Sequence, residues 1–285
     1  MLQDRLKLSE RRACEIAGQH RSTQRHEPIA APDDQALRRA LRKIANKKPR
    51  WGYRRAHGHL LSEGWSINRK RVQRIWREEG LRVPARKRKR RRLGESTVDG
   101  ANRLRAERPN HVWALDFQHD ATADGRELKF LNVVDEFTRE SLAIECDRTI
   151  DADQTVAVLE RLASRRGAPE NLRADNGPEL TARVLAEWCK SGSTDTAYID
   201  PGAPWQNGWI ESFNARFRDE VLDVEEINDL SEARFLAAEW RRDYNEEHPH
   251  SALGMITPSR FAASWQRTGE ANGSVNPELS EGVDR

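Results

Sequence analysis

Three acidic residues lie in sequence contexts that could bring their carboxylates together. Asp116 lies in "HVWALDFQHD", where apolar and polar residues alternate as in a strand with one buried face. Asp175 lies in "RADNGPEL", where Asp-Asn-Gly predicts a turn after a short strand. Glu211 lies in "NGWIESFN", within a predicted helix. If the first and fourth strands of the sheet are neighbours, Asp116 and Asp175 meet at one edge, and the helix supplies Glu211.

Three converging carboxylates repel one another and require a cation. Oxygen ligands without His or Cys spacing favour Mg²⁺ or Mn²⁺. Two such ions, about 4 Å apart, can hold the attacking and leaving oxygens of a phosphoryl displacement. Other interpretations of these acidic residues stay open at this point. Asp175 can simply end a strand. Asp120 is a competing carboxylate on the strand face of Asp116, roughly 10 Å or more further along, and Asp135 can have a structural role.

The elements that must position these residues begin at residue 111. The pattern predicts a three-stranded antiparallel meander, then helix, strand, helix, strand and a long helix with Pro204 near its first turn. This order predicts an α/β fold with a mixed five-stranded sheet covered by helices.

Residues 33–81 predict a small all-α domain. Leu37, Leu41 and Ile44 recur at helical spacing, and a basic helix over "SINRKRVQRIWREEG" has Ser66 as its expected N-cap and Gly80 as its stop. Short helices joined by a tight turn, the last one basic, are typical of a helix-turn-helix. The alternative is a small bundle with a solvated basic face. The outward residues of the basic helix, which we expect to contact DNA, are Arg69, Lys70, Gln73, Arg74 and Arg77.

Charge divides the chain into two halves of opposite sign. Residues 1–100 hold 28 Lys and Arg against 11 Asp and Glu, whereas the remainder holds 21 against 35. A basic half joined to an acidic half predicts a polyanionic partner, usually nucleic acid. The block "ARKRKRRR" continues this pattern, and we expect it to follow DNA phosphates with a steep salt dependence. Its basic residues are Arg86, Lys87, Arg88, Lys89, Arg90, Arg91 and Arg92.

The composition excludes several other classes of protein. No run of 18 apolar residues is present, and the first residues lack the apolar core of a signal peptide, so neither a membrane partner nor secretion is expected. Cys14, Cys146 and Cys189 lack metal-ligand spacing and indicate a reducing compartment. No Ser, Tyr or Cys nucleophile constellation competes with the carboxylates.

The sequence resembles the OrfB-type transposases of bacterial insertion sequences of the IS-three family, within the retroviral-integrase-like DDE superfamily. The matching stretches include "WALDF", "LNVVDEFTRE", "RADNGPEL", "DPGAPWQNGWIESFNARFRDE" and "WRRDYNEEHPHSALGMITPSRF", with "GYRR" and "NRKRVQRIWREEGL" upstream, and cover roughly residues 33–265. The 35 residues between Asp175 and Glu211 equal the spacing of that family.

The resemblance implies a ribonuclease-H-like catalytic core and carries the catalytic and metal-ligand roles onto Asp116, Asp175 and Glu211. The expected cofactors are two divalent ions, Mg²⁺ or Mn²⁺. Asn176 and Asn207 are expected to support the site. "DFQHD" departs from the family in lacking the Thr-Tyr often found after the first Asp.

The expected function is a DNA transposase that frees a 3′-OH at an element end and joins it to DNA by metal-dependent phosphoryl transfer. The alternatives are a structure-selective nuclease and a non-catalytic DNA-binding regulator. Expected partners are duplex DNA, further copies of the chain and an upstream-frame product, in the bacterial cytoplasm near the nucleoid. The expected domains are an N-terminal segment 1–32, the helix-turn-helix-like domain 33–81, a basic linker 82–110, the integrase-type catalytic domain 111–265 and a disordered tail 266–285.

Overall fold

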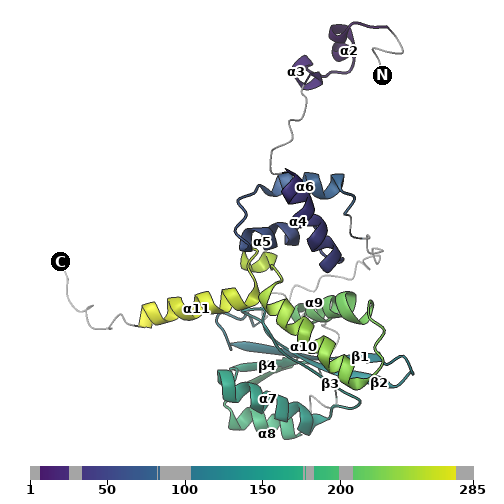
Figure 1. Cartoon of the computed structure of the whole chain (residues 1–285). Coiled ribbons are helices and arrows are strands. Elements are labelled where there is room, and N and C mark those ends of the chain that lie inside the picture. The colour runs from purple at the N-terminus through teal and green to yellow at the C-terminus, as the bar shows by residue number, and fades with distance from the viewer. Residues whose placement is uncertain are drawn as a thin grey trace, which may run out of the picture.

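The structure is a computed structural model of the 285-residue chain, and it describes residues 7–25, 34–81, 83, 104–175, 177, 183–198 and 208–273. Two short helices, α2 (Glu10–Ile16) and α3 (Arg21–Gln24), precede a three-helix domain, which lies against a larger domain built on a sheet (Figure 1). The block Arg86–Arg92, Asn176 and Asn207 lie outside the described residues.

The small domain contains α4 (Asp34–Lys47), α5 (Tyr53–Ser62) and α6 (Arg69–Glu78). Its core holds the predicted residues Leu37 and Leu41, which are fully buried together with Leu60, Val72 and Ile75. The predicted N-cap is wrong by two residues, because Asn68, not Ser66, accepts a hydrogen bond from the backbone N–H of Lys70. Asn is as good an N-cap as Ser, so the sequence offered both.

The larger domain contains a five-stranded sheet in the order β3-β2-β1-β4-β5. β1 pairs antiparallel with β2 and parallel with β4, and β4 pairs parallel with β5. The first and fourth strands are therefore neighbours, which is the condition for Asp116 and Asp175 to meet at one edge. The strands are β1 (Val112–Ala121), β2 (Glu127–Asp135), β3 (Ser141–Asp147), β4 (Asn171–Ala174) and β5 (Asp195–Tyr198).

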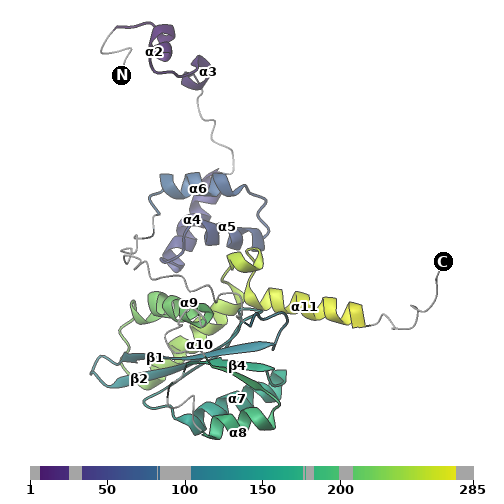
Figure 2. The same ribbon diagram turned by 180° about the vertical axis from the view of Figure 1, so that it is seen from behind.

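Helices cover both faces of the sheet, as the view from behind also shows (Figure 2). One core joins Trp113, Leu115 and Leu131 to α7 (Ala152–Arg166) and α8 (Arg183–Ser191). The other joins Ala114 and Phe130 to α9 (Gly208–Phe217), the π-helical turn η3 (Arg218–Leu222) and α10 (Leu230–Glu246). The alternation along β1 thus separates the two cores, which places the even-numbered residues, Asp116 among them, on the α9 side.

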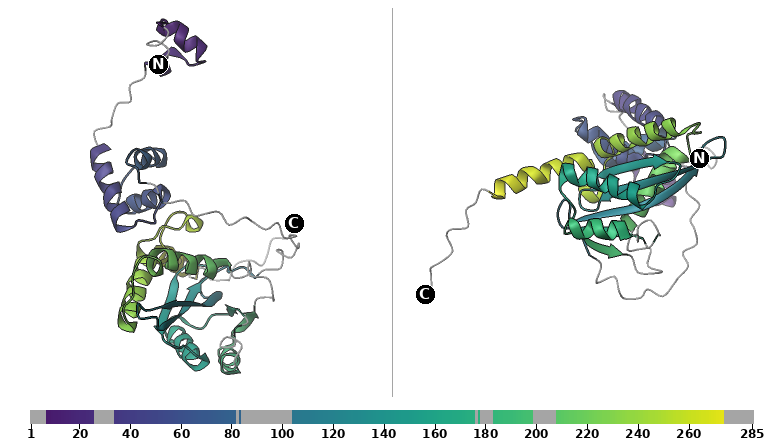
Figure 3. Two further views of the ribbon diagram at one scale, coloured as in Figure 1. Left: turned by 90° about the vertical axis from the view of Figure 1, so that its right-hand side faces the viewer. Right: turned by 90° about the horizontal axis from the view of Figure 1, so that it is seen from below.

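Charged and aromatic side chains join the two domains, which lie one against the other in side view as well (Figure 3). Lys48 pairs with Asp243, and Arg55 Nη1 lies 2.9 Å from Glu220 Oε1. The rings of Trp51 and His248, both buried, meet edge to face with centroids 5.0 Å apart. The small domain therefore has a defined position on the sheet domain.

Two segments near the predicted domain boundaries have a defined structure. Residues 104–110, within the predicted linker, lie against the sheet domain: Arg173 Nη2 donates to the Leu104 carbonyl at 2.8 Å, and the Asn110 N–H donates to Asp135 at 2.8 Å. The prediction of a disordered tail is wrong for 266–273, because α11 (Pro258–Gly273) continues through them after the 3₁₀ turn η4 (Ser251–Leu253). Once a helix exists, each further residue adds a hydrogen bond, so α11 continues past the predicted boundary.

Candidate active site

Asp116 lies in the middle of β1, and its carboxylate is held by two hydrogen bonds. Oδ1 accepts from the Phe117 N–H at 2.9 Å, and Oδ2 accepts from Asn214 Nδ2 at 2.7 Å. The side chain is half-buried beneath α9. Its orientation is therefore set by its own strand and by the covering helix.

Asp175 follows β4 directly and is exposed. The parallel register pairs Ala114 with Arg173, so Asp116 and Asp175 each lie two residues further along their chains. Asp175 Oδ1 accepts from the Gly177 N–H at 3.0 Å, which is the predicted local turn. The turn and the presentation of Asp175 at the sheet edge are thus compatible.

Glu211 lies in the first turn of α9 and is exposed. Asn214 follows it by one helical turn on the same face and donates to Asp116. Glu211 is thereby carried by the helix that is bonded directly to Asp116.

The three carboxylates act on one another electrostatically. Burial, together with the negative charges of Asp175 and Glu211, raises the pKa of Asp116 to about 6, against the hydrogen bonds from Phe117 and Asn214. Asp175 and Glu211 therefore each lie near enough to Asp116 for their charges to disfavour its ionised form. A group that resists ionisation in this way favours a bound cation.

The donor set fits a hard divalent cation, because all three residues offer carboxylate oxygens. Within the described ranges no group of three or more His, Cys, Asp or Glu residues forms a closed ligand cluster. The two observations are consistent, because charges act over longer distances than metal–ligand bonds allow.

Asn214 and Asn132 form a polar network that the sequence analysis missed. Asn132 lies opposite Asp116 in the β1–β2 register and is fully buried. Its Nδ2 donates to Asn214 Oδ1 at 2.7 Å and to Gln118 Oε1 at 3.3 Å. The available signals were the position of Asn214 three residues after Glu211 and a polar residue in the apolar strand "FLNVV".

The competing carboxylates have other partners. Asp120 lies 3.4 Å from Arg218 Nη1. Asp135 is fully buried and accepts from the backbone N–H groups of Asn110, Phe137 and Thr138. Asp135 thus closes the β2–β3 turn and anchors residue 110, which is the structural role considered for it.

The predicted DNA-contacting face of α6 is only partly available. Arg69, Lys70 and Arg77 are exposed, and Gln73 is half-buried. Arg74 is exposed but paired with Glu78 at 2.8 Å and with Asp34 at 3.4 Å. The free cationic surface of the helix is therefore smaller than its composition suggests.

Comparisons with known proteins agree with this architecture. Family models described as "Integrase core domain" match residues 106–204 and 193–258, and one described as "HTH-like domain" matches residues 32–90. The ribonuclease-H-like fold and the helix-turn-helix-like domain are thereby confirmed. None of the described helices is both long and apolar enough to cross a membrane.

Similar proteins are encoded by insertion elements. The "Insertion element IS476 uncharacterized 39.2 kDa protein" of Xanthomonas euvesicatoria is 43% identical over 274 residues, which cover 95% of this chain and 78% of that protein. The "Insertion element IS407 uncharacterized 31.7 kDa protein" of Burkholderia multivorans is 39% identical over 276 residues, covering 95% and 96%. Among solved structures, the HTLV-2 integrase catalytic core domain in complex with magnesium aligns with a TM-score of 0.46 at 18% identity, covering 55% of this chain and 99% of that one.

Proposed function

The chain belongs to the integrase-core transposases of bacterial insertion sequences, in the IS-three family and of the OrfB type, and we propose that it cuts the ends of its element and joins them to new DNA. The observation that supports this proposal most directly is that Asp116, held on β1 of an integrase core by Asn214 of α9, has a pKa raised by burial and by the charges of Asp175 and Glu211. The runner-up, a nuclease on the same fold, would cut and not join.

The proposed reaction consists of two displacements at phosphorus. In the first, the oxygen of water attacks the phosphodiester at the element end, and the bond to the 3′ oxygen breaks to leave a 3′-OH and a 5′-phosphate. In the second, that 3′ oxygen attacks a phosphodiester of the target, a new P–O bond forms, and a target 3′-OH leaves. No covalent bond to the protein forms.

The side chains have separate tasks in this proposal. Asp116, Asp175 and Glu211 would hold two Mg²⁺ or Mn²⁺ ions, which would stabilise charge on the phosphoryl group and lower the pKa of the attacking water or 3′-OH. Asn214 orients Asp116 through the 2.7 Å hydrogen bond. α6 and the basic residues 86–92 would bind duplex DNA through its phosphates.

The active complex in this proposal contains more than one copy, because two element ends must be held together. Association with an upstream-frame product, which would add end specificity, is part of the same proposal. Because its substrate in this proposal is DNA, the protein would act in the bacterial cytoplasm beside the nucleoid.

The test is a joining assay with labelled element ends, a target plasmid and Mg²⁺. Wild-type protein should yield joined products, whereas Asp116→Asn, Asp175→Asn and Glu211→Gln should each lose cleavage and joining and retain DNA binding. The matched control is Asp147→Asn, because Asp147 is a strand carboxylate paired with Arg234 at 2.6 Å. Cleavage without joining by wild-type protein would favour the nuclease, and joining by any triad variant at the wild-type rate would remove that residue from the site.

A further inference from the structure

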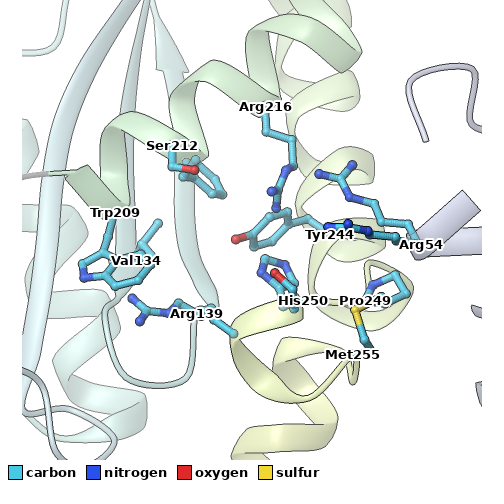
Figure 4. Close-up of a pocket in the computed structure, with 14 residues that line it drawn as sticks. Arg54, Val134, Arg139, Trp209, Ser212, Arg216, Tyr244, Pro249, His250 and Met255 are labelled. Atoms are coloured by element: carbon cyan, nitrogen blue, oxygen red, sulfur yellow. The ribbon is translucent and has the colours of Figure 1, made fainter. Parts of the chain in front are cut away.

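The face of α9 that carries Trp209, Ser212 and Arg216 borders an arginine-rich cavity. The cavity has a volume of about 310 Å³ and lies between α5, α9, α10 and residues 249–255 (Figure 4). Trp209, Ser212 and Arg216 of α9 line it, at the spacing of one helix face. Glu211 and Asn214 lie on another face of the same helix and do not line the cavity.

The lining carries four guanidinium groups, from Arg54 and Arg55 of α5, Arg139 of the β2–β3 turn, and Arg216 of α9. The described residues that line the cavity include no Asp or Glu. Glu220, beside the lining, accepts from Arg55. Arg216 and Arg54 instead lie near the rings of Tyr244 and Tyr53, each 5.9 Å from the ring centroid. The cavity therefore has an excess of positive charge.

Burial and the neighbouring positive charges act together on two side chains of this cavity. Burial lowers the pKa of His250 to about 2, and the charges of Arg216, Arg55 and Arg139 act in the same direction. Within the described part of the chain, the buried Nε2 atom of His250 has no hydrogen-bond partner. Burial also lowers the pKa of Arg55, and Arg216 adds to this effect. An anion in the cavity would relieve the repulsion among these cations.

We propose that the arginine cavity, lined by Arg54, Arg55, Arg139 and Arg216, binds a phosphate group of the DNA backbone. Guanidinium groups match phosphate oxygens in charge and in the geometry of paired hydrogen bonds. Trp209 is 39% exposed, with the Arg139 guanidinium carbon 3.3 Å from its ring centroid. Aromatic rings beside arginines are common where proteins follow a nucleic-acid backbone. This inference rests on the proposed function, because it assigns a further contact to the same DNA.

The position of the cavity relates it to the reacting bond. The catalytic face and the cavity face belong to one helix, whose diameter with side chains is about 10–12 Å. DNA rises about 3.4 Å for each nucleotide of a strand. The phosphate in the cavity would therefore lie a few nucleotides from the phosphodiester at Asp116, and it would fix the path of the strand across α9.

The first experiment measures DNA binding by the full chain in EDTA, as a function of salt. The variant is Arg54→Gln with Arg216→Gln, and the control is Arg242→Gln, which removes a guanidinium from an exposed pair with Glu239. We expect the double variant to bind a short duplex about tenfold more weakly. Its slope of log affinity against log salt should become shallower by about 0.9, because one phosphate is no longer neutralised. Melting curves of all variants check that they are folded.

The second experiment locates the phosphate on the DNA. One phosphate at a time is replaced by a neutral methylphosphonate. At one position, a few nucleotides from the cut bond, this replacement should weaken DNA binding by wild-type protein. The same replacement should not weaken binding by the double variant any further, because that variant already lacks the contact. Equal slopes for the double variant and the control, or equal losses for both proteins at every position, would overturn the proposal.

Two competitors distinguish other anions from the DNA backbone. Inorganic phosphate and a glutamate-rich peptide are each tested for protection of the protein against thermal unfolding. If one of them protects wild-type protein more strongly than the duplex does, and fails to protect the double variant, the cavity belongs to that ligand and the proposal is overturned. These binding measurements need no catalysis. Failure of wild-type protein to join DNA would therefore count against the proposed function alone.

Discussion

Asp116 should destabilise the metal-free protein at neutral pH, because its ionised side chain is half-buried and is repelled by Asp175 and Glu211. Asp116→Asn should therefore raise the free energy of unfolding in EDTA at pH 7 by about 1–2 kcal/mol, given about 1.4 kcal/mol for each unit of pKa shift and some loss from solvent exposure. Asn Oδ1 can accept one of the two hydrogen bonds that the carboxylate accepts from Phe117 and Asn214, and the loss of the other keeps the gain below the full value. Chemical denaturation of both proteins measures the difference.

The pH dependence of this difference is specific. Between the ordinary pKa of 3.8 and the raised value of about 6, the folded wild-type protein binds more protons than the unfolded chain. Its stability therefore falls as the pH rises through this window, whereas Asp116→Asn lacks the effect. The advantage of the variant should be absent at pH 4 and complete by pH 7. A variant less stable than wild type at pH 7 would contradict the assigned repulsion.

The elements that carry the three acidic residues were easier to predict than the side chains that contact them. The strand, turn and helix that hold Asp116, Asp175 and Glu211 were predictable, because strand alternation, turn chemistry and helix spacing are local patterns. Asn214 and Asn132 were not, because the bond between them joins residues 82 positions apart. The arginine cavity is harder still, since its cations come from three separate segments with no shared periodicity.

At the scale of elements, the contact of α5 with the catalytic domain depends on Gly58. A Cβ atom on Gly58 would lie 2.9 Å from Pro249 Cβ and 3.1 Å from Met255 Cε. In an open helix Gly→Ala adds about 1 kcal/mol of stability. Here Gly58→Ala should instead destabilise by about 1–3 kcal/mol, because Pro249 is rigid and something must shift. A melting temperature above that of wild type would show that this contact yields without cost.

Element types were predictable where periodicity is strong, and their mutual packing was not. The order of strands and helices through α9 follows from the sequence, as does the buried face of α6. The interface between the domains depends on Lys48 and Asp243, 195 residues apart, and on two buried rings. Neither residue type nor spacing marks such a pair, because only the folded chain brings them together.

For the whole molecule, we expect the opposite charges of the two halves to separate binding from chemistry. Neutral replacements of Arg86 to Arg92 in the full chain should flatten the slope of log affinity against log salt by several units, at about 0.9 for each phosphate that the block neutralises. The melting temperature should stay near that of wild type. An unchanged slope would mean that the block is solvated and does not touch DNA.

The small domain has a fixed position on the catalytic domain, and this has a consequence for the bound DNA. Lys48 with Asp243, and Trp51 against His248, hold α6 at a set distance from Asp116. If α6 recognises a sequence at the element end, the fixed distance between α6 and Asp116 sets a fixed spacing on the DNA. The protein then determines how many base pairs separate the recognised sequence from the bond that is cut. Inserting five base pairs between them would turn the read sequence to the opposite side of the duplex, whose repeat is about 10 base pairs. Elements of this kind are therefore expected to tolerate changes of sequence in that interval far better than changes of its length.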